Sequence, residues 1–228
     1  GSVTVLTMGP PKLEDPLLEL LARGASRAVL ITGRLMAGAD TRATARALAS
    51  AAEKLGPFDA VFCGCKAIDG ETGQVPGELA AALGLPCISN AEKVEAAGDE
   101  LLVTRRLEDG VQNLTVSGSA MVSFSSYSYP LRLAGILGMR RARKTPVEIL
   151  TAADLGLTPE DCKADFIAAA SLLALAQLFE NVLFLDGRAV ARQERDLHRV
   201  AEKAAHRGLV MLAGKHCGRH KDRALLAV

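Results

Sequence analysis

The sequence predicts an α/β fold with a doubly wound, mostly parallel, Rossmann-like sheet. Two observations support this prediction. Apolar runs of strand length alternate with stretches of helical periodicity, which is typical of right-handed β-α-β units. The runs are also continuous, as in AVLI at residues 28–31, and such runs indicate strands buried on both faces. The apolar content of 49% comes largely from Ala, Leu and Val, which suits helices packed on a buried sheet.

Each element has its own local signals. Gly9 ends the first apolar run, Gly24 ends the first helix, and Asp40 or Thr41 can cap the long helix that follows. Further along, Asp109-Gly110 lies between two strand-like runs and predicts a β-hairpin insertion. The predicted strands are 3–8, 27–32, 58–63, 101–107, 111–116 and the short apolar run 120–124, and the predicted helices are 13–23, 41–55 and 76–83.

Composition narrows the class of protein. The formal net charge is +1, aromatic residues make up 4% of the chain, and Trp is absent. These values disfavour nucleic-acid binding. The five cysteines lack the spacing of a disulfide framework or a zinc site, so we expect buried thiols in a reducing, cytoplasmic environment. His216, Cys217 and His220 lack a fourth ligand, and we expect no metal there.

The most informative segment is FDAVFCGCKAIDGETGQVPGELAAA, at residues 58–82. It predicts a strand, a glycine-containing loop and a helix, an order that directs backbone N–H groups and a helix N-terminus toward an anion. The segment is neither GxGxxG nor a P-loop. From the residues alone, the loop is therefore either a phosphate or nucleotide site, or a tight turn that binds nothing.

The amino-acid sequence of this loop resembles the signature of the electron-transfer flavoprotein beta (small) subunit family. The resemblance rests on CKAIDGETGQV at 65–75, together with VTVLTMGPP at 3–11, AGADT at 37–41, RLEDG at 106–110 and TAADLGL at 151–157. It covers residues 3–160, which we expect to form an electron-transfer-flavoprotein-like nucleotide-binding domain. It implies an electron carrier without catalysis of its own.

The resemblance also implies a cofactor, which is AMP in ordinary members and FAD in electron-bifurcating members. The loop here is more similar to the bifurcating type. Thr41 and Thr72 could donate to phosphate, while Gln74 could bind a base, a ribose or a flavin. The implied cofactor-binding residues are Asp40, Thr41, Gly64, Lys66, Ala67, Asp69, Gly70, Thr72, Gly73, Gln74 and Val75.

A second segment, YPLRLAGILGMRRARK at 129–144, resembles the family's recognition loop. Apolar residues flanked by fixed positive charge suit fast, weak, electrostatically steered encounters. The implied partners are an electron-transfer flavoprotein alpha subunit, in a heterodimer, and flavoprotein dehydrogenases such as acyl-CoA dehydrogenases. The implied partner-docking residues are Leu131, Arg132, Leu133, Arg140, Arg141, Arg143 and Lys144.

Residues 161–228 are predicted to form a C-terminal helical arm. The apolar stretch 166–185 contains Gln177, Glu180 and Asn181, so we expect it to pack on protein rather than to insert into a membrane. An amphipathic helix is predicted at about 189–207.

The resemblance implies that the family has a strand, a hairpin and a helix before residue 3, so we expect an N-terminally truncated domain. The sheet should then have an unfilled slot or an exposed strand beside strand 3–8 or strand 60–63. Two alternative functions stay open. One is an adenine-nucleotide-binding module of the universal-stress-protein type, and the other is a non-functional fragment.

Overall fold

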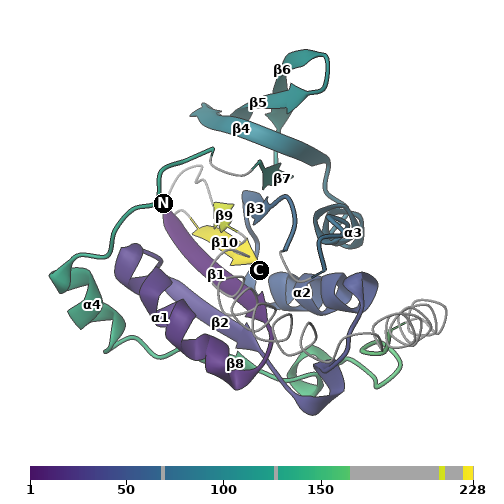
Figure 1. Ribbon diagram of the computed structural model, residues 1–228, viewed down its shortest axis with the longest axis vertical. Helices are drawn as coiled ribbons and strands as arrows, with labels where there is room; N and C mark the ends of the chain where they lie inside the picture. Colours follow the sequence, from purple (N-terminus) through teal and green to yellow (C-terminus); the bar gives the residue numbers. More distant parts are fainter. Residues whose placement is uncertain (68–69, 126–127, 165–210, 214–222, 228) are drawn as a thin grey trace, which may run out of the picture.

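A computed structural model describes residues 1–67, 70–125, 128–164, 211–213 and 223–227. Its centre is a sheet with the strand order β6-β5-β4-β7-β3-β10-β1-β2-β8, and β9 pairs with β1 outside this path (Figure 1). The parallel part comprises β1 (Ser2–Met8), β2 (Arg27–Ile31), β3 (Ala60–Gly64), β7 (Ala120–Phe124), β8 (Glu148–Leu150) and β10 (Arg223–Ala227). The predicted Rossmann-like sheet is confirmed.

Helices cover both faces of this sheet, as in a doubly wound fold (Figure 1). Neighbouring side chains of one strand enter different cores, because successive residues of a strand point to opposite faces. Val5 and Leu30 pack with Leu17 of α1 (Glu14–Arg23), whereas Leu6 packs on the other face with Leu48 of α2 (Thr41–Leu55). The remaining helices are α3 (Val75–Ala82), on the α2 side, and α4 (Ile136–Ala142), on the α1 side.

The loops that follow the parallel strands have well-defined starts and ends. Asp40 is the N-cap of α2, and its carboxylate accepts a hydrogen bond of 2.9 Å from the Ala43 N–H. Gly24 ends α1 with a φ of 125°, a conformation that side chains rarely adopt. Short 3-10 turns lie at Pro11–Leu13, Arg34–Met36 and Ala153–Leu155. The predicted helix bounds agree with the structure to within about two residues.

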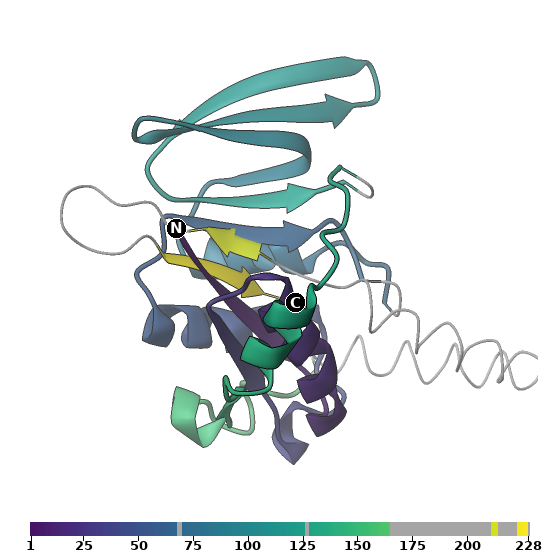
Figure 2. The same ribbon diagram turned by 90° about the vertical axis from the view of Figure 1, so that its left-hand side faces the viewer.

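Three antiparallel strands form an arm at one end of the sheet (Figure 2). They are β4 (Cys87–Ala97), β5 (Glu100–Leu107) and β6 (Gly110–Ser117), and the β5–β6 hairpin confirms the prediction at Asp109-Gly110. The sequence analysis did not predict β4. This strand pairs in parallel with β7 up to Ala91 and in antiparallel with β5 from there on, and Asn90 has a φ of 58° at the change.

The expected unfilled slot is absent from the described part of the sheet, and that prediction is wrong. β10 lies between β1 and β3, with Thr4 opposite Leu225 on one side and Val61 opposite the same Leu225 on the other. A central slot would leave the backbone N–H and C=O groups of two buried strands without partners, which is costly, so an apolar segment from elsewhere in the chain fills it. β9 (Met211–Ala213) joins β1 at Val3. The predicted helices at 166–185 and 189–207 lie outside the described residues.

Candidate functional site

Two loops meet at the edge of the sheet where the parallel strands end. The loop after β2 leads into α2, and the loop after β3 leads into α3, so both helix N-termini lie at this edge. The Thr41 hydroxyl lies 3.3 Å from Gln74 Oε1 and 3.1 Å from Glu78 Oε1. Open parallel sheets bind their ligands at this edge. The structure therefore brings together the two segments that the sequence analysis assigned to one site.

The loop between β3 and α3 is folded on itself. The Glu71 N–H donates to the Ala67 carbonyl at 3.1 Å, and the exposed Lys66 ammonium lies 3.6 Å from the Glu71 carboxylate. Glu71 and Gly73 both have left-handed φ values, 50° and 64°. A Cβ at position 73 would also lie 3.3 Å from the Cys65 carbonyl oxygen, so glycine suits this close approach.

The other predicted cofactor-binding residues surround this loop. Gly64 ends β3 and Val75 begins α3, while Gly70 and Thr72 are exposed within the loop. Asp69 lies outside the described residues. Asp40 caps α2, so one of its carboxylate oxygens has a structural partner. Two helix N-termini meet here, and the loop before α3 has left-handed residues at positions 71 and 73. Both features are typical of sites that bind an anion.

The sequence analysis missed Glu78 as a member of this site. Glu78 lies in the first turn of α3, where an acidic residue is favoured by the helix dipole and attracts no special notice. Its Oε1 contacts the Thr41 hydroxyl. Its Oε2 is buried and has no hydrogen-bond partner among the described residues. The sequence signal was the position of the acid in the first helical turn after the loop.

Two thiols near the site, those of Cys63 and Cys87, are poor nucleophiles. Burial raises the pKa of the Cys63 thiol far above its usual range, and the Sγ atom lies 3.6 Å from the Met121 sulfur. Burial also raises the pKa of Cys87. Both side chains therefore stay protonated at neutral pH. Within the described residues, no group of three or more His, Cys, Asp or Glu side chains could hold a metal ion.

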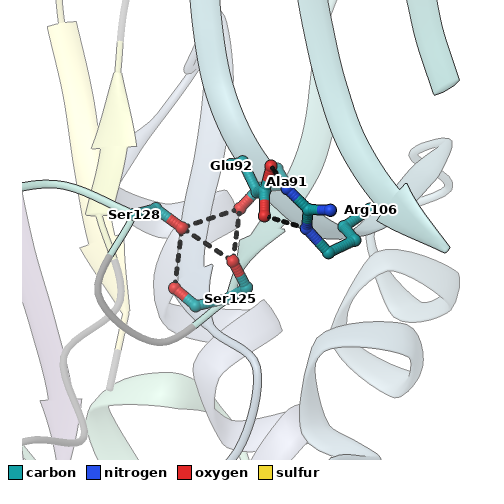
Figure 3. Close-up of polar contacts among 5 residues, drawn as sticks. All are labelled: Ala91, Glu92, Arg106, Ser125 and Ser128. Carbon is teal, nitrogen blue, oxygen red and sulfur yellow. Dashed lines mark hydrogen bonds and ion pairs between the residues drawn. The ribbon is translucent and has the colours of Figure 1, made fainter. Parts of the chain in front are cut away.

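The loop after β7 is fastened to the arm by a polar cluster (Figure 3). The Ala91 carbonyl accepts hydrogen bonds from the Ser125 N–H at 3.0 Å and from the Ser128 hydroxyl at 3.1 Å. The Ser128 hydroxyl also contacts the Ser125 carbonyl and hydroxyl, each at 2.8 Å. Arg106 forms an ion pair with Glu92 beside this cluster. The cluster fixes the chain to β4 next to its change of partner.

Tyr129 extends this attachment toward the predicted docking residues. Its hydroxyl accepts a hydrogen bond of 2.9 Å from the Val94 N–H. Its ring packs edge-to-face on Phe124, and Phe124 packs in the same way on Phe62 of β3, with centroid distances of 5.7 and 5.4 Å. This aromatic row connects β3, which leads into the candidate site loop, with the segment that begins at Tyr129.

The segment that follows exposes its apolar side chains. Leu131, Leu133 and Leu137 are 68%, 83% and 80% exposed, and Ile136 and Met139 are exposed as well. All the predicted basic docking residues are exposed beside them: Arg132, Arg140, Arg141, Arg143 and Lys144. We call residues 131–144 the apolar–basic segment. Exposed apolar side chains beside positive charge make this segment a candidate surface for association with another protein.

The helix of this segment, α4, packs closely on α1 at Gly138. The backbone of α4 approaches α1 so closely at Gly138 that a Cβ there would overlap the Ala22 carbonyl oxygen. Arg141 donates to the Leu21 carbonyl at 3.4 Å, and Ala142 is buried. Because Gly138 and Ala142 face α1, Ile136 and Leu137 are left on the outer side.

Comparisons with known proteins place these features in a family. A family model described as the electron transfer flavoprotein domain matches residues 1–155. An electron transfer flavoprotein subunit beta from Thermoanaerobacterium thermosaccharolyticum is 46% identical over 156 residues, which are 68% of this chain and 60% of the relative. Protein FixA from Azorhizobium caulinodans is 42% identical, over 69% of this chain and 58% of the relative.

A more distant relative is the caffeyl-CoA reductase-Etf complex subunit CarD from Acetobacterium woodii. It is 35% identical over 160 residues, which are 70% of this chain and 61% of the relative. The chain thus spans about three fifths of the length of these relatives.

The fold and the site define a Rossmann-like α/β domain with a candidate ligand site at the carboxyl ends of its strands and an exposed apolar–basic segment. The family match covers more than half of the chain. The chain therefore belongs to the electron transfer flavoprotein family, among the beta subunits.

Proposed function

We propose that this chain is the electron-carrier beta subunit of an electron transfer flavoprotein and that it holds an adenine nucleotide at the junction of α2 and α3. The observation that supports this most directly is the contact of Thr41 with Gln74 and Glu78. It joins two segments that lie 33 residues or more apart in the chain. The buried, unpartnered Glu78 Oε2 adds a hydrogen-bonding position that a ligand would satisfy.

The residues present fit a nucleotide. The loop at 70–74 would hold the phosphate through backbone N–H groups at the start of α3, where the helix dipole favours an anion. Thr41, Gln74 and Glu78 would bind the less charged part of the ligand. Lys66, whose ammonium group is paired with the Glu71 carboxylate, would add positive charge beside the phosphate. The similarity of the loop to the bifurcating type favours FAD over AMP, and a bound flavin would supply the electron transfer itself.

The apolar–basic segment would carry the encounters with partner proteins. Leu133 is the most exposed of its leucines, and we propose it as the anchor that enters a partner's pocket, with Arg140, Arg143 and Lys144 steering the approach. The proposed stable partner is an alpha subunit in a heterodimer, and the transient partners are flavoprotein dehydrogenases. No helix in the described part of the chain is long and apolar enough to cross a bilayer.

Calorimetric titration of the purified chain with AMP and with FAD tests the proposal, followed by co-expression with an electron transfer flavoprotein alpha subunit. We expect nucleotide binding by the chain, co-elution with the alpha subunit, and flavin absorbance in excess of that of the alpha subunit alone if FAD is the ligand. Binding of AMP without alpha-subunit association or flavin would favour the universal-stress-type module. A folded chain that binds neither nucleotide would refute the proposal.

A further inference from the structure

Two acceptor oxygens lie within hydrogen-bond distance of a single hydroxyl at the junction of α2 and α3. The Thr41 hydroxyl can donate to only one atom at a time, and its neighbours are Gln74 Oε1 at 3.3 Å and Glu78 Oε1 at 3.1 Å. The second carboxylate oxygen of Glu78 is buried beside them and has no partner among the described residues. The cluster therefore has more acceptors than donors.

An excess of acceptors selects the kind of ligand atom that can approach. The Asp40 carboxylate caps α2 next to Thr41, so a second acidic group lies at this helix end. Lys66, the cation of the neighbouring loop, is paired with Glu71. A phosphate oxygen beside the Glu78 carboxylate would meet like charge, whereas an O–H or N–H group would meet a charged acceptor, which forms the stronger hydrogen bond.

We propose that Thr41, Gln74 and Glu78 form a donor-binding subsite, in which Glu78 accepts a hydrogen bond from a hydroxyl or amine of the bound nucleotide. The phosphate then lies away from Thr41, on the loop at 70–74. This inference rests on the proposed nucleotide-binding function. It replaces the expectation that the Thr41 hydroxyl donates to phosphate, and it adds Glu78 as a residue that determines specificity.

The donor could come from two parts of the nucleotide, the ribose hydroxyls or the exocyclic amine of adenine. Titrations with 5′-AMP, 2′-deoxy-AMP, 3′-deoxy-AMP and purine riboside 5′-monophosphate separate these sources, because each analogue lacks one donor. The variants are Glu78→Gln and Thr41→Val. Glu53→Gln is the matched control, because it makes the same chemical change on an exposed acid near the C-terminal end of α2, at the opposite end of this helix from Thr41.

We expect Glu78→Gln to weaken AMP binding by about tenfold or more, the size of a hydrogen bond to a charged group. The same substitution should change binding by less than about threefold for the one analogue that lacks the donor, which identifies the source. Glu53→Gln should leave every affinity nearly unchanged. The ligand-free thermal stability of Glu78→Gln should not fall, since the substitution removes a buried carboxylate oxygen without a partner.

If Glu78→Gln lowers the affinity for all four ligands equally, or for none of them, the inference is overturned. The proposed function still stands in that case, provided that the wild-type chain binds AMP. A folded wild-type chain that binds neither these four ligands nor FAD would instead remove the proposed function itself. If Glu78→Gln fails to fold, Thr41→Val provides the same comparison. Thr41→Val keeps the side-chain shape but removes the hydroxyl that contacts Glu78. It should lower the affinity for AMP more than the affinity for the analogue that lacks the donor.

Discussion

Substitution of Gly138 by alanine tests how the apolar–basic segment is held on the domain. A Cβ at this position would overlap the Ala22 carbonyl oxygen and lie 3.2 Å from the Ala22 carbonyl carbon. Ordinary contact between carbon atoms is about 3.5–4.0 Å, so α4 must move away from α1 or the end of α1 must yield. Inserting a methyl group into such a packed contact costs about 1–3 kcal/mol.

Part of this cost is offset by the conformational preference of alanine. Replacing glycine inside a helix gains up to about 1 kcal/mol. We therefore expect Gly138→Ala to lower the free energy of unfolding by about 1–2 kcal/mol in urea denaturation. Hydrogen exchange should also be faster at the amides of α4, because the helix loses its seat on α1.

Gly77→Ala is the matched control, because Gly77 lies in α3 and a Cβ there would meet no heavy atom within 4 Å. It should be neutral or stabilising by up to about 1 kcal/mol. The reasoning is refuted if Gly138→Ala is as stable as Gly77→Ala and the amide protection of α4 is unchanged.

Three further predictions concern other parts of the fold. Leu225→Pro removes a backbone N–H donor from β10, which has neighbouring strands on both sides. It should lower the free energy of unfolding by about 3 kcal/mol or more. An unchanged urea midpoint would contradict the placement of β10. Tyr129→Phe keeps the ring on Phe124 but removes the acceptor of the Val94 N–H, so a loss of about 1 kcal/mol in urea denaturation is expected, and a larger loss for Tyr129→Ala; equal losses would argue against the hydrogen bond. Hydrogen bonds from Thr151 and Thr158 lower the pKa of Asp154 and Asp161, respectively, below the ordinary value of 3.8. The stability that these carboxylates add is therefore present above pH 3.8 and declines as the pH falls below it. Thr151→Val and Thr158→Val should weaken this acid dependence, as measured by urea midpoints across the acid range.

The sequence by itself determined the features that depend on neighbouring residues. Continuous apolar runs predicted β2 and β3, because a strand buried on both faces has no side that must be polar. Asp40 and Gly24 marked helix ends through their own side-chain and backbone preferences. Asp109-Gly110 marked the hairpin. The loop at 65–75 was also recognisable, because its family resemblance is carried by consecutive residues.

Only the tertiary structure decided the features that join distant segments. β4 has polar and exposed positions along most of its length, and it is a strand because β7 and β5 supply its hydrogen bonds. β10 fills a slot whose need arises from β1 and β3. Glu78 belongs to the site because the α2 N-terminus brings Thr41 to it, and Gly138 matters because α1 lies against it. Local propensity determines what a segment can become, whereas unsatisfied backbone groups and close contacts between elements determine which neighbours it finally has.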